Sequence, residues 1–327
     1  MQVSSRPDVS NKKQVSTVVF QRTLKRSVSC VGIGLHSGQA AKLTIKPAKV
    51  DKGINFKRGD VHPNIAEIKA HWDNVVDTRM CSVIGNNSGI TVSTVEHIMA
   101  ALAGCGIDNA EIEVDGSEVP IMDGSSEPFV SLIKRAGVVE QNQPRRVIRI
   151  CKEVKVSVGE ASASLEPGNF FDLKFQIDFE SEAVGRQEFS LGLMNGSFCK
   201  ELASARTFGF LHEVEKMRAA GLAKGGSLDN AVVVSGDRVL NEEGLRFDNE
   251  FVRHKILDAV GDLYLAGAPI IGRFNGSRSG HAVNNALLRA LFADNEAWVF
   301  DEMRGKEALT AVDGGFKAEI ETAIVNS

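Results

Sequence analysis

The sequence predicts an α+β fold divided into two domains. Segments in which apolar and polar residues alternate are typical of half-buried strands, and other segments carry apolar residues at helical spacing. The chain has 327 residues, of which 43% are hydrophobic. It can therefore bury a large core, and its length is more typical of two domains than of one.

The expected strands and helices lie in both halves of the chain. The strands are AKLTIKP (41–47), AEIEV (110–114), RRVIRI (145–150), VKVSV (154–158), FDLKFQIDF (171–179) and APIIGRF (268–274). The helices are EHIMAALAG (96–104), FVSLIKRAG (129–137), HKILDAVGDLYLAG (254–267) and HAVNNALLRALFA (281–293). In each half, a histidine-bearing helix ending in LAG precedes a strand, a turn-rich loop and a second helix. An internal duplication would give this order, and so would two unrelated units of similar design.

A polar segment between the halves predicts the domain boundary. VVEQNQPRR, at residues 138–146, follows a predicted helix and is typical of a linker. We therefore expect a first domain over 20–142 and a second over 143–318. The polar residues 1–19 are expected to form a flexible extension, and 319–327 a C-terminal tail.

Composition argues against several classes of protein. The net charge of -4 does not favour a protein devoted to nucleic acid, although a local site for a phosphorylated small molecule is compatible with it. The five cysteines are scattered and show no C-x-x-C spacing, so neither a disulfide framework nor a thiolate zinc site is expected, and the cytosol is the expected compartment. The N-terminal residues lack the apolar region of a signal peptide, and no apolar run is long enough to span a membrane.

A row of polar side chains marks the helix predicted near residue 260. His254, Asp258 and Asp262 are spaced four residues apart, so they project from one side of an α-helix. Apolar residues form a stripe on the same helix. The polar row either faces water or contributes to a ligand site, and this helix alone does not distinguish the two.

The histidine-bearing helix of the first half offers partners for this row. Glu96 and His97 stand in the first turn of that helix. His97, His254 and Asp258 make a set suited to a catalytic zinc ion, because three protein ligands leave one tetrahedral position open for water. Glu96 would then act as the base that takes a proton from this water.

Both residues of the first helix also have ordinary structural explanations. Ser93, Thr94, Val95 and Glu96 match a capping box, in which the glutamate reaches back to the helix N-cap. His97 is compatible with a hydrogen-bonded histidine at a helix start. Only the combination with the second helix favours a functional role.

His281 is a further histidine with a chemically useful position. It follows Gly276 and Gly280 and begins a predicted helix, on a loop that can face a cleft. A helix N-terminus disfavours imidazolium, so a proton-donating His281 needs a carboxylate beside it, and Asp262 is the available candidate. The alternative is an ordinary surface histidine.

Long blocks of sequence extend these single motifs. In order along the chain they are QRTLKRSV, GIGLHSG, STVEHIMAALAGCGIDNAEIEV, PIMDGS, SARTFGF, GLRFDNEFVRHKILDAVGDL and SGHAVNNALL. Together they resemble the family of UDP-3-O-acyl-N-acetylglucosamine deacetylases, zinc enzymes that commit precursors to lipid A synthesis in Gram-negative bacteria. The resemblance runs from about residue 20 to the C-terminal region, and it is far more specific than any single short motif.

The resemblance implies a layered architecture and a reaction. Each domain is expected to be a small sheet with helices, and the helices of both domains are expected to pack between the two sheets. The implied reaction removes the N-acetyl group from UDP-3-O-(3-hydroxyacyl)-N-acetylglucosamine and gives the free amine and acetate. The expected cofactor is Zn²⁺, the expected partner is this small-molecule substrate, and the chain is expected to be a cytoplasmic monomer.

The resemblance also assigns the metal ligands and the acid–base groups. The implied zinc ligands are the set described above, His97, His254 and Asp258. Glu96 is implied to be the general base. His281 is implied to protonate the leaving amine, with Asp262 behind it.

Substrate contacts are implied mainly in the second half of the chain. Thr207 in SARTFGF resembles the hydroxyl donor of the family to the developing oxyanion. Lys255 and Arg278 are the candidates for the diphosphate, and Arg278 stands where lysine is common in the family. Phe208 and an insert near 205–232 are expected to line a passage for the acyl chain. Within the insert, the segment RTFGFLHEVEKMRAAGLAKGG (206–226) is predicted to be a helix.

Two functions of other kinds remain compatible with the residues. A zinc amidohydrolase for another acetylated sugar would differ only in the chemistry of its pocket. A non-enzymatic binding module with a structural zinc would need a fourth ligand and would leave Glu96 and His281 without a task. No role is assigned to His36 in GLHSG.

Overall fold

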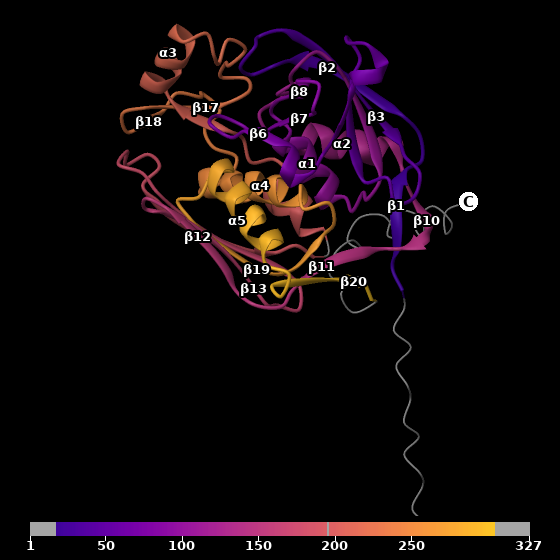
Figure 1. The fold of residues 1–327 in the computed structure, drawn as a ribbon. Helices are drawn as coiled ribbons and strands as arrows, with labels where there is room; N and C mark the ends of the chain where they lie inside the picture. The colour runs from indigo at the N-terminus through magenta and orange to yellow at the C-terminus, as the bar shows by residue number, and fades with distance from the viewer. Residues whose placement is uncertain (1–17, 195, 305–327) are drawn as a thin grey trace, which may run out of the picture.

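The computed structural model describes residues 18–194 and 196–304. Each half of the chain forms a main sheet of its own beside smaller ones, and helices lie between the two main sheets (Figure 1). This mixed arrangement confirms the predicted α+β class.

Strands are spread along the whole of the described chain. In the first half they are β1 (Phe20–Leu24), β2 (Val28–Ile33), β3 (Ala40–Pro47), β4 (Ile54–Arg58), β5 (Glu67–Lys69), β6 (Val75–Asp77), β7 (Val83–Gly85), β8 (Thr91–Val92), β9 (Ala110–Asp115) and β10 (Val138–Pro144). In the second half they are β11 (Arg146–Ile150), β12 (Val154–Val158), β13 (Ala161–Glu166), β14 (Phe171–Asp178), β15 (Arg186–Gly192), β16 (Phe208–Phe210), β17 (Val232–Ser235), β18 (Arg238–Val239), β19 (Ile270–Ser277) and β20 (Trp298–Glu302).

Helices follow the main strands of each half. They are α1 (Glu96–Gly104), α2 (Glu127–Ala136), α3 (Leu211–Ala219), α4 (Glu250–Tyr264) and α5 (His281–Ala293), with short helical turns η1 (Pro63–Ile65), η2 (Trp72–Asn74) and η3 (Phe198–Leu202). The ranges of α1 and α5 match the predicted helices, and α2 and α4 begin a few residues earlier than predicted.

The sheet of the first half has the order β2-β3-β9-β4-β5, in which β4 and β9 run parallel and the other neighbours antiparallel. In β3, exposed and buried residues alternate, and Leu43 and Ile45 are fully buried. One face of the strand therefore packs on the core while the other meets solvent, which is the pattern that predicted this strand.

The sheet of the second half is organised around β19. Along its path the order is β12-β13-β19-β11-β20, and β14 also pairs with β19 and carries β15 on its other side. Phe175 of β14 and Phe274 of β19 are fully buried and lie with their ring centroids 6.2 Å apart. These aromatic rings fill the core beneath the helices.

Helices α1, α4 and α5 lie between the two sheets (Figure 1). Helix α1 packs against α4, and α5 packs against α4 and against β12 and β13. Both α1 and α4 are buried along most of their length, polar residues included. A polar side chain in such a helix must find a partner inside the protein.

The segment predicted to be a linker instead forms strand β10, which pairs antiparallel with β1. Most of 138–146 is therefore a strand, and its role as a linker between two domains stays a prediction. Residues of β10 are mostly exposed, so their polar character resembled that of a loop. The partner strand lies more than a hundred residues away, and local sequence does not reveal such a pairing.

The helix predicted in the insert near 205–232 begins only at Leu211. Before it, Phe208–Phe210 forms β16, which pairs in parallel with β17. The prediction that the helix includes Phe208 is therefore wrong. Three strands, β16, β17 and β18, form a small sheet beside α3 in the described chain (Figure 1).

The predicted N-terminal extension and C-terminal tail fall mostly outside the described residues. Of 1–19, the structure describes Val18, which forms a β-bridge with Arg304, and Val19, whose backbone N donates to the Met303 carbonyl oxygen at 3.1 Å. The domain boundaries stay a prediction. Among the described residues, no helix is both long and apolar enough to cross a membrane.

Candidate metal centre and active site

Helices α1 and α4 cross in close contact, and a glycine makes this approach feasible. A Cβ atom at Gly261 of α4 would lie 2.0 Å from the carbonyl oxygen of Glu96. Any larger residue would collide with the backbone of α1 at this point. The crossing places the first turn of α1 beside the polar row of α4.

Donor atoms of the predicted ligand set converge at this crossing. The ligand atoms of His97, His254 and Asp258 all lie within 4.8 Å of one another. Asp258 Oδ1 is 3.3 Å from His254 Nε2 and 3.5 Å from His97 Nε2. The three residues are buried and come from both halves of the chain.

The Oδ1 atom of Asp258 is buried and has no hydrogen-bond partner. Buried polar atoms are normally paired, and an unpaired carboxylate oxygen carries a large desolvation penalty. Two imidazole nitrogens and one carboxylate oxygen are donors that zinc prefers. The residues therefore fit a divalent metal that would complete the pairing of this atom.

His254 is held in the form that a metal ligand requires. Its Nδ1 lies 3.0 Å from the carbonyl oxygen of Ala205, which can only accept a hydrogen bond. The ring proton is therefore on Nδ1, and Nε2 is free to bind a metal. Burial lowers the pKa of His254 to about 3 against the attraction of Asp258, so the imidazole is neutral at pH 7.

Asp258 is held as a carboxylate by its neighbours. Lys255 Nζ donates to Asp258 Oδ2 at 2.5 Å, and both side chains are largely buried. Burial opposes ionisation of Asp258, but attraction by His254 and Lys255 holds the pKa of this carboxyl well below its usual range. One oxygen of Asp258 is thus paired with Lys255 and the other faces the imidazoles.

Glu96 does not cap its helix. The N-cap of α1 is Val95, and no side chain caps this helix end. Glu96 Oε2 instead accepts a hydrogen bond from the backbone N of Ser82 at 3.0 Å, and Oε1 lies 3.8 Å from His281 Nε2. Burial raises the pKa of Glu96 despite attraction by His281 and His97. A carboxylate of raised pKa beside the ligand set is suited to accept a proton.

His281 and Asp262 form the second acid–base pair of the site. His281 Nδ1 lies 2.9 Å from Asp262 Oδ2, and Asp262 also accepts hydrogen bonds from Ser82 Oγ at 2.6 Å and Asn284 Nδ2 at 2.8 Å. Burial opposes protonation of His281, but Asp262 and Glu96 raise its pKa to about 9. His281 is therefore an imidazolium at pH 7, the state that a general acid needs.

The three candidate metal ligands, Glu96 and His281 border a cavity of about 530 Å³. Thr207, Phe208 and Lys255, which the family resemblance implies as substrate-side residues, line the same cavity. Thr207 and Phe208 also line an adjoining cavity of about 340 Å³. The wall of the second cavity includes the apolar side of α3, with Leu211, Val214 and Met217.

Arg278 lies apart from the other predicted substrate contacts. Its guanidinium pairs with Glu160 and, at 2.6 Å, with Asp178. Arg278 does not belong to the lining of the 530 Å³ cavity, as far as the described residues define that lining. His36, by contrast, lines both cavities, and its two ring nitrogens are buried without a hydrogen-bond partner.

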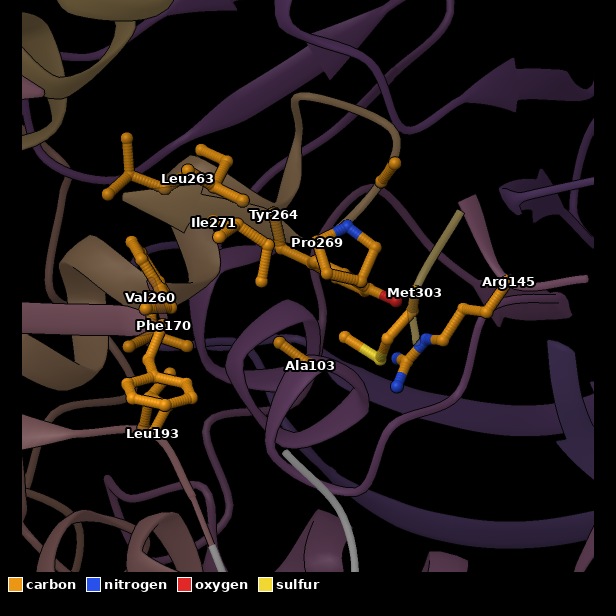
Figure 2. Close-up of a pocket in the computed structure, with 13 residues that line it drawn as sticks. Ala103, Arg145, Phe170, Leu193, Val260, Leu263, Tyr264, Pro269, Ile271 and Met303 are labelled. Carbon is orange, nitrogen blue, oxygen red and sulfur yellow. The ribbon is translucent and has the colours of Figure 1, made fainter. Parts of the chain in front are cut away.

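A smaller cavity of about 60 Å³ lies elsewhere along the same helices (Figure 2). Its lining is apolar except for Arg145 and Tyr264. Arg145 Nε donates to Asp108 Oδ1 at 2.7 Å, and the Tyr264 hydroxyl donates to the Ile107 carbonyl oxygen at 2.7 Å. Among the described residues around this cavity, the polar groups are thus engaged in structural pairs, so the cavity at the helix crossing is the candidate active site.

Sequence reasoning missed two residues that hold the acid–base groups. Ser82 bonds Glu96 through its backbone and Asp262 through its hydroxyl. Asn284 also bonds Asp262, and its position three residues after His281 places it one helical turn away, a spacing that indicates proximity. No motif marked Ser82, because its partners are distant in the sequence.

Comparison with known proteins agrees with this geometry. The family described as UDP-3-O-acyl N-acetylglycosamine deacetylase matches residues 21–293, most of the chain. The chain belongs to this deacetylase family. The family membership predicted from the sequence is therefore confirmed.

Individual deacetylases are similar over almost their whole length. A UDP-3-O-acyl-N-acetylglucosamine deacetylase of Acidithiobacillus ferrooxidans is 52% identical over 293 residues, which cover 89% of this chain and 96% of the relative. One of Phenylobacterium zucineum is 51% identical over 280 residues, covering 86% and 96%. One of Haemophilus influenzae is 46% identical over 309 residues, covering 94% and 100%. These similarities confirm the predicted enzyme class, a deacetylase.

Proposed function

We propose that the chain removes the acetyl group from UDP-3-O-(3-hydroxyacyl)-N-acetylglucosamine, a step of lipid A biosynthesis, and that His97, His254 and Asp258 hold one zinc ion for this reaction. The observation that carries the proposal is the buried, unpaired Oδ1 of Asp258, which faces two imidazole nitrogens. Three protein ligands would leave one position of a bound zinc ion for water, as a catalytic site requires.

The acid–base groups divide the proton transfers between them. Bound zinc would supply a Lewis acid that polarises the acetyl carbonyl and lowers the pKa of water toward about 7. Glu96 takes the proton of the attacking water, and its burial favours the protonated product of that step. His281 then donates from Nε2 to the leaving nitrogen, because an amine is a poor leaving group unless it is protonated.

Neighbouring side chains set these two groups in place. Glu96 Oε1 and His281 Nε2 are 3.8 Å apart, so both can address the same amide group. Asp262 accepts from His281 Nδ1 and holds the imidazolium charge while Nε2 faces the substrate. Thr207 lines the cavity, where its hydroxyl would donate to the oxyanion.

The two adjoining cavities suit the two ends of the substrate. The acyl chain enters the cavity lined by α3 and Phe208, since apolar side chains form much of its wall. Lys255 and Arg278 serve the diphosphate. Lys255 would share its ammonium between Asp258 and a phosphate oxygen, whereas Arg278 would have to turn from Glu160 and Asp178.

We also propose two domains over 20–142 and 143–318, with the acyl insert near 205–232. The separate sheets of the two halves support this division. The chain would work as a monomer in the cytoplasm. The free cysteines among the described residues are compatible with a reducing compartment.

Product analysis tests the proposed reaction. Purified protein is incubated with the UDP-linked acyl-sugar, and free amine and acetate are measured, with Glu96→Gln as a control matched in fold and zinc content. Amine release that depends on zinc and on Glu96 is expected. Release from other acetylated sugars but not from this one would indicate a different amidohydrolase, and zinc binding without release would indicate a binding module.

A further inference from the structure

The polar row of α4 begins one turn earlier than the sequence motif indicated. Glu250 lies four residues before His254, so it stands on the same side of the helix, and it is fully buried. It is not a member of the ligand set and does not line the active-site cavity among the described residues. A buried carboxylate outside the site needs another explanation.

Arg206 donates most of the hydrogen bonds that the Glu250 carboxylate accepts. The backbone N and the Nε of Arg206 both donate to Glu250 Oε1 at 2.9 Å, and Nη2 donates to Oε2 at 3.2 Å. Oε2 also accepts from the backbone N of Arg246 at 2.7 Å. Arg206 itself is only 2% exposed, and its remaining donors reach Glu243 Oε1 at 2.6 Å and the Gly244 carbonyl oxygen at 2.7 Å.

The neighbours of Arg206 in the chain both serve the active site. The carbonyl oxygen of Ala205 accepts the Nδ1 proton of His254 at 3.0 Å. Thr207 lines the cavity, and its backbone N donates to the Gly124 carbonyl oxygen at 2.8 Å. The three consecutive residues 205–207 therefore orient a metal ligand, anchor on α4 and present a hydroxyl to the substrate.

We propose that Arg206 and Glu250 are positioning residues for catalysis, because their ion pair fixes residues 205–207 against the helix that carries the metal ligands. The inference rests on the proposed function. An anchored Ala205 carbonyl holds the His254 proton on Nδ1 and leaves Nε2 for the metal. The same anchor fixes the backbone of Thr207, whose hydroxyl must meet the oxyanion within hydrogen-bond distance.

A charge-balanced variant separates positioning from folding. Arg206→Met alone would leave a buried, unpaired carboxylate, which is strongly destabilising. The double variant Arg206→Met with Glu250→Gln removes both charges together, and the glutamine oxygen can still accept from the backbone N of residue 206, which bonds the carboxylate in the wild type. Urea unfolding establishes that this variant is folded. Glu243→Gln is the matched control, because Glu243 pairs with the same guanidinium but its side chain is 59% exposed.

Zinc affinity and steady-state kinetics provide the first two measurements. The double variant should bind zinc ~10- to 100-fold more weakly and lose kcat by a similar factor at saturating zinc. Its KM should stay within ~2-fold of wild type, because the pair does not contact the substrate. Glu243→Gln should leave all three constants unchanged. A folded double variant with wild-type zinc affinity and kcat would overturn the proposal.

A third measurement does not depend on zinc or on activity. Nitrogen NMR of metal-free protein reports which ring nitrogen of His254 carries the proton. Wild type should show a single form protonated on Nδ1, and the double variant a mixture of both forms. An unchanged tautomer in the double variant would refute the positioning role. If the tautomer of His254 differs between wild type and the double variant as expected but wild type releases no amine, the positioning role stands and the proposed function is contradicted.

Discussion

Two cavities border the same pair of helices, and they differ in how their polar atoms are satisfied. Figure 2 shows the residues that line the small apolar cavity, Arg145 and Tyr264 among them. Arg145 is paired with Asp108, and the Tyr264 hydroxyl with a backbone carbonyl. Around the candidate active site, Asp258 Oδ1 and both ring nitrogens of His36 are buried without partners. The polar side chains that line the apolar cavity are thus paired, whereas several polar atoms at the candidate active site are not.

The difference separates residues that stabilise the fold from residues suited to bind a ligand. A buried polar atom without a partner lowers stability, so a ligand that pairs with it recovers part of that loss. Substitutions at the active-site cavity should therefore change chemistry and metal content with modest effects on stability. Substitutions at the apolar cavity should lower stability and leave the chemistry and the metal content unchanged.

The largest effect is expected at a metal ligand. In His254→Ala the site retains only two of its three ligands, so zinc should fall from about one ion per chain to a small fraction, and turnover should fall with it. Elemental analysis after dialysis, paired with the amine-release assay, measures both. Full zinc occupancy together with full turnover would exclude His254 from the site.

Loss of the base should reduce turnover without loss of metal. Glu96→Gln keeps an oxygen that can accept the hydrogen bond from Ser82 but cannot take up a proton. We expect kcat to fall by ~10²- to 10⁴-fold, the usual contribution of a positioned general base. Zinc content matched to wild type makes the comparison valid, and an unchanged kcat would remove Glu96 from the mechanism.

The alkaline side of the pH profile should belong mainly to His281. Burial lowers the pKa of His281, but Asp262 and Glu96 together raise it from 6.5 to about 9. A bound metal ion adds positive charge and opposes this rise, so kcat/KM should decline with a midpoint between these two values. In His281→Ala this decline should flatten and the rate should drop. A midpoint below 6.5 would contradict the ion pair with Asp262.

Arg278→Ala tests the phosphate contact with a smaller expected effect. Arg278 is exposed and water screens its charge, so KM for the UDP-linked substrate should rise only a few-fold at low salt while kcat stays constant. The rise should shrink as salt is added. An unchanged KM would show that Arg278 serves only its carboxylate partners Glu160 and Asp178.

The smallest effect on chemistry is expected at the apolar cavity. Ile270→Val removes one methyl group from its lining and should lower the free energy of unfolding by ~0.5 to 1.5 kcal/mol. Urea unfolding measures this loss. The variant should keep the zinc content and kcat of wild type, and a fall in either would show that the two cavities are coupled.

Much of the fold was predictable because its elements carry local patterns. Strand β3 alternates in burial as its sequence alternates in polarity, and α5 was predicted over its observed range. Strand β10 was missed because its partner β1 is far away in the chain and its own residues are polar and exposed. Phe208 was predicted to be helical for a similar reason, because its strand pairs with β17, which lies more than twenty residues later in the chain.

The site was predictable where spacing or resemblance marked it. The polar row of α4 and the histidine of α1 meet as expected, because helical periodicity fixed which side chains share a face. Ser82, Arg206 and Glu250 were missed because hydrogen bonds between distant segments define them. Sequence reasoning finds groups that share a helix more readily than groups that support them from elsewhere.

The most direct test of the metal centre is anomalous diffraction at the zinc edge from crystals of the zinc-loaded protein. We expect one strong peak at the crossing of α1 and α4, about 2.0 to 2.2 Å from His97 Nε2, His254 Nε2 and Asp258 Oδ1. These ligand atoms lie within 4.8 Å of one another, so small side-chain movements would bring all three to bonding distance of one ion. A peak bound by other residues, or no peak in protein that releases amine, would contradict the assignment of these three ligands.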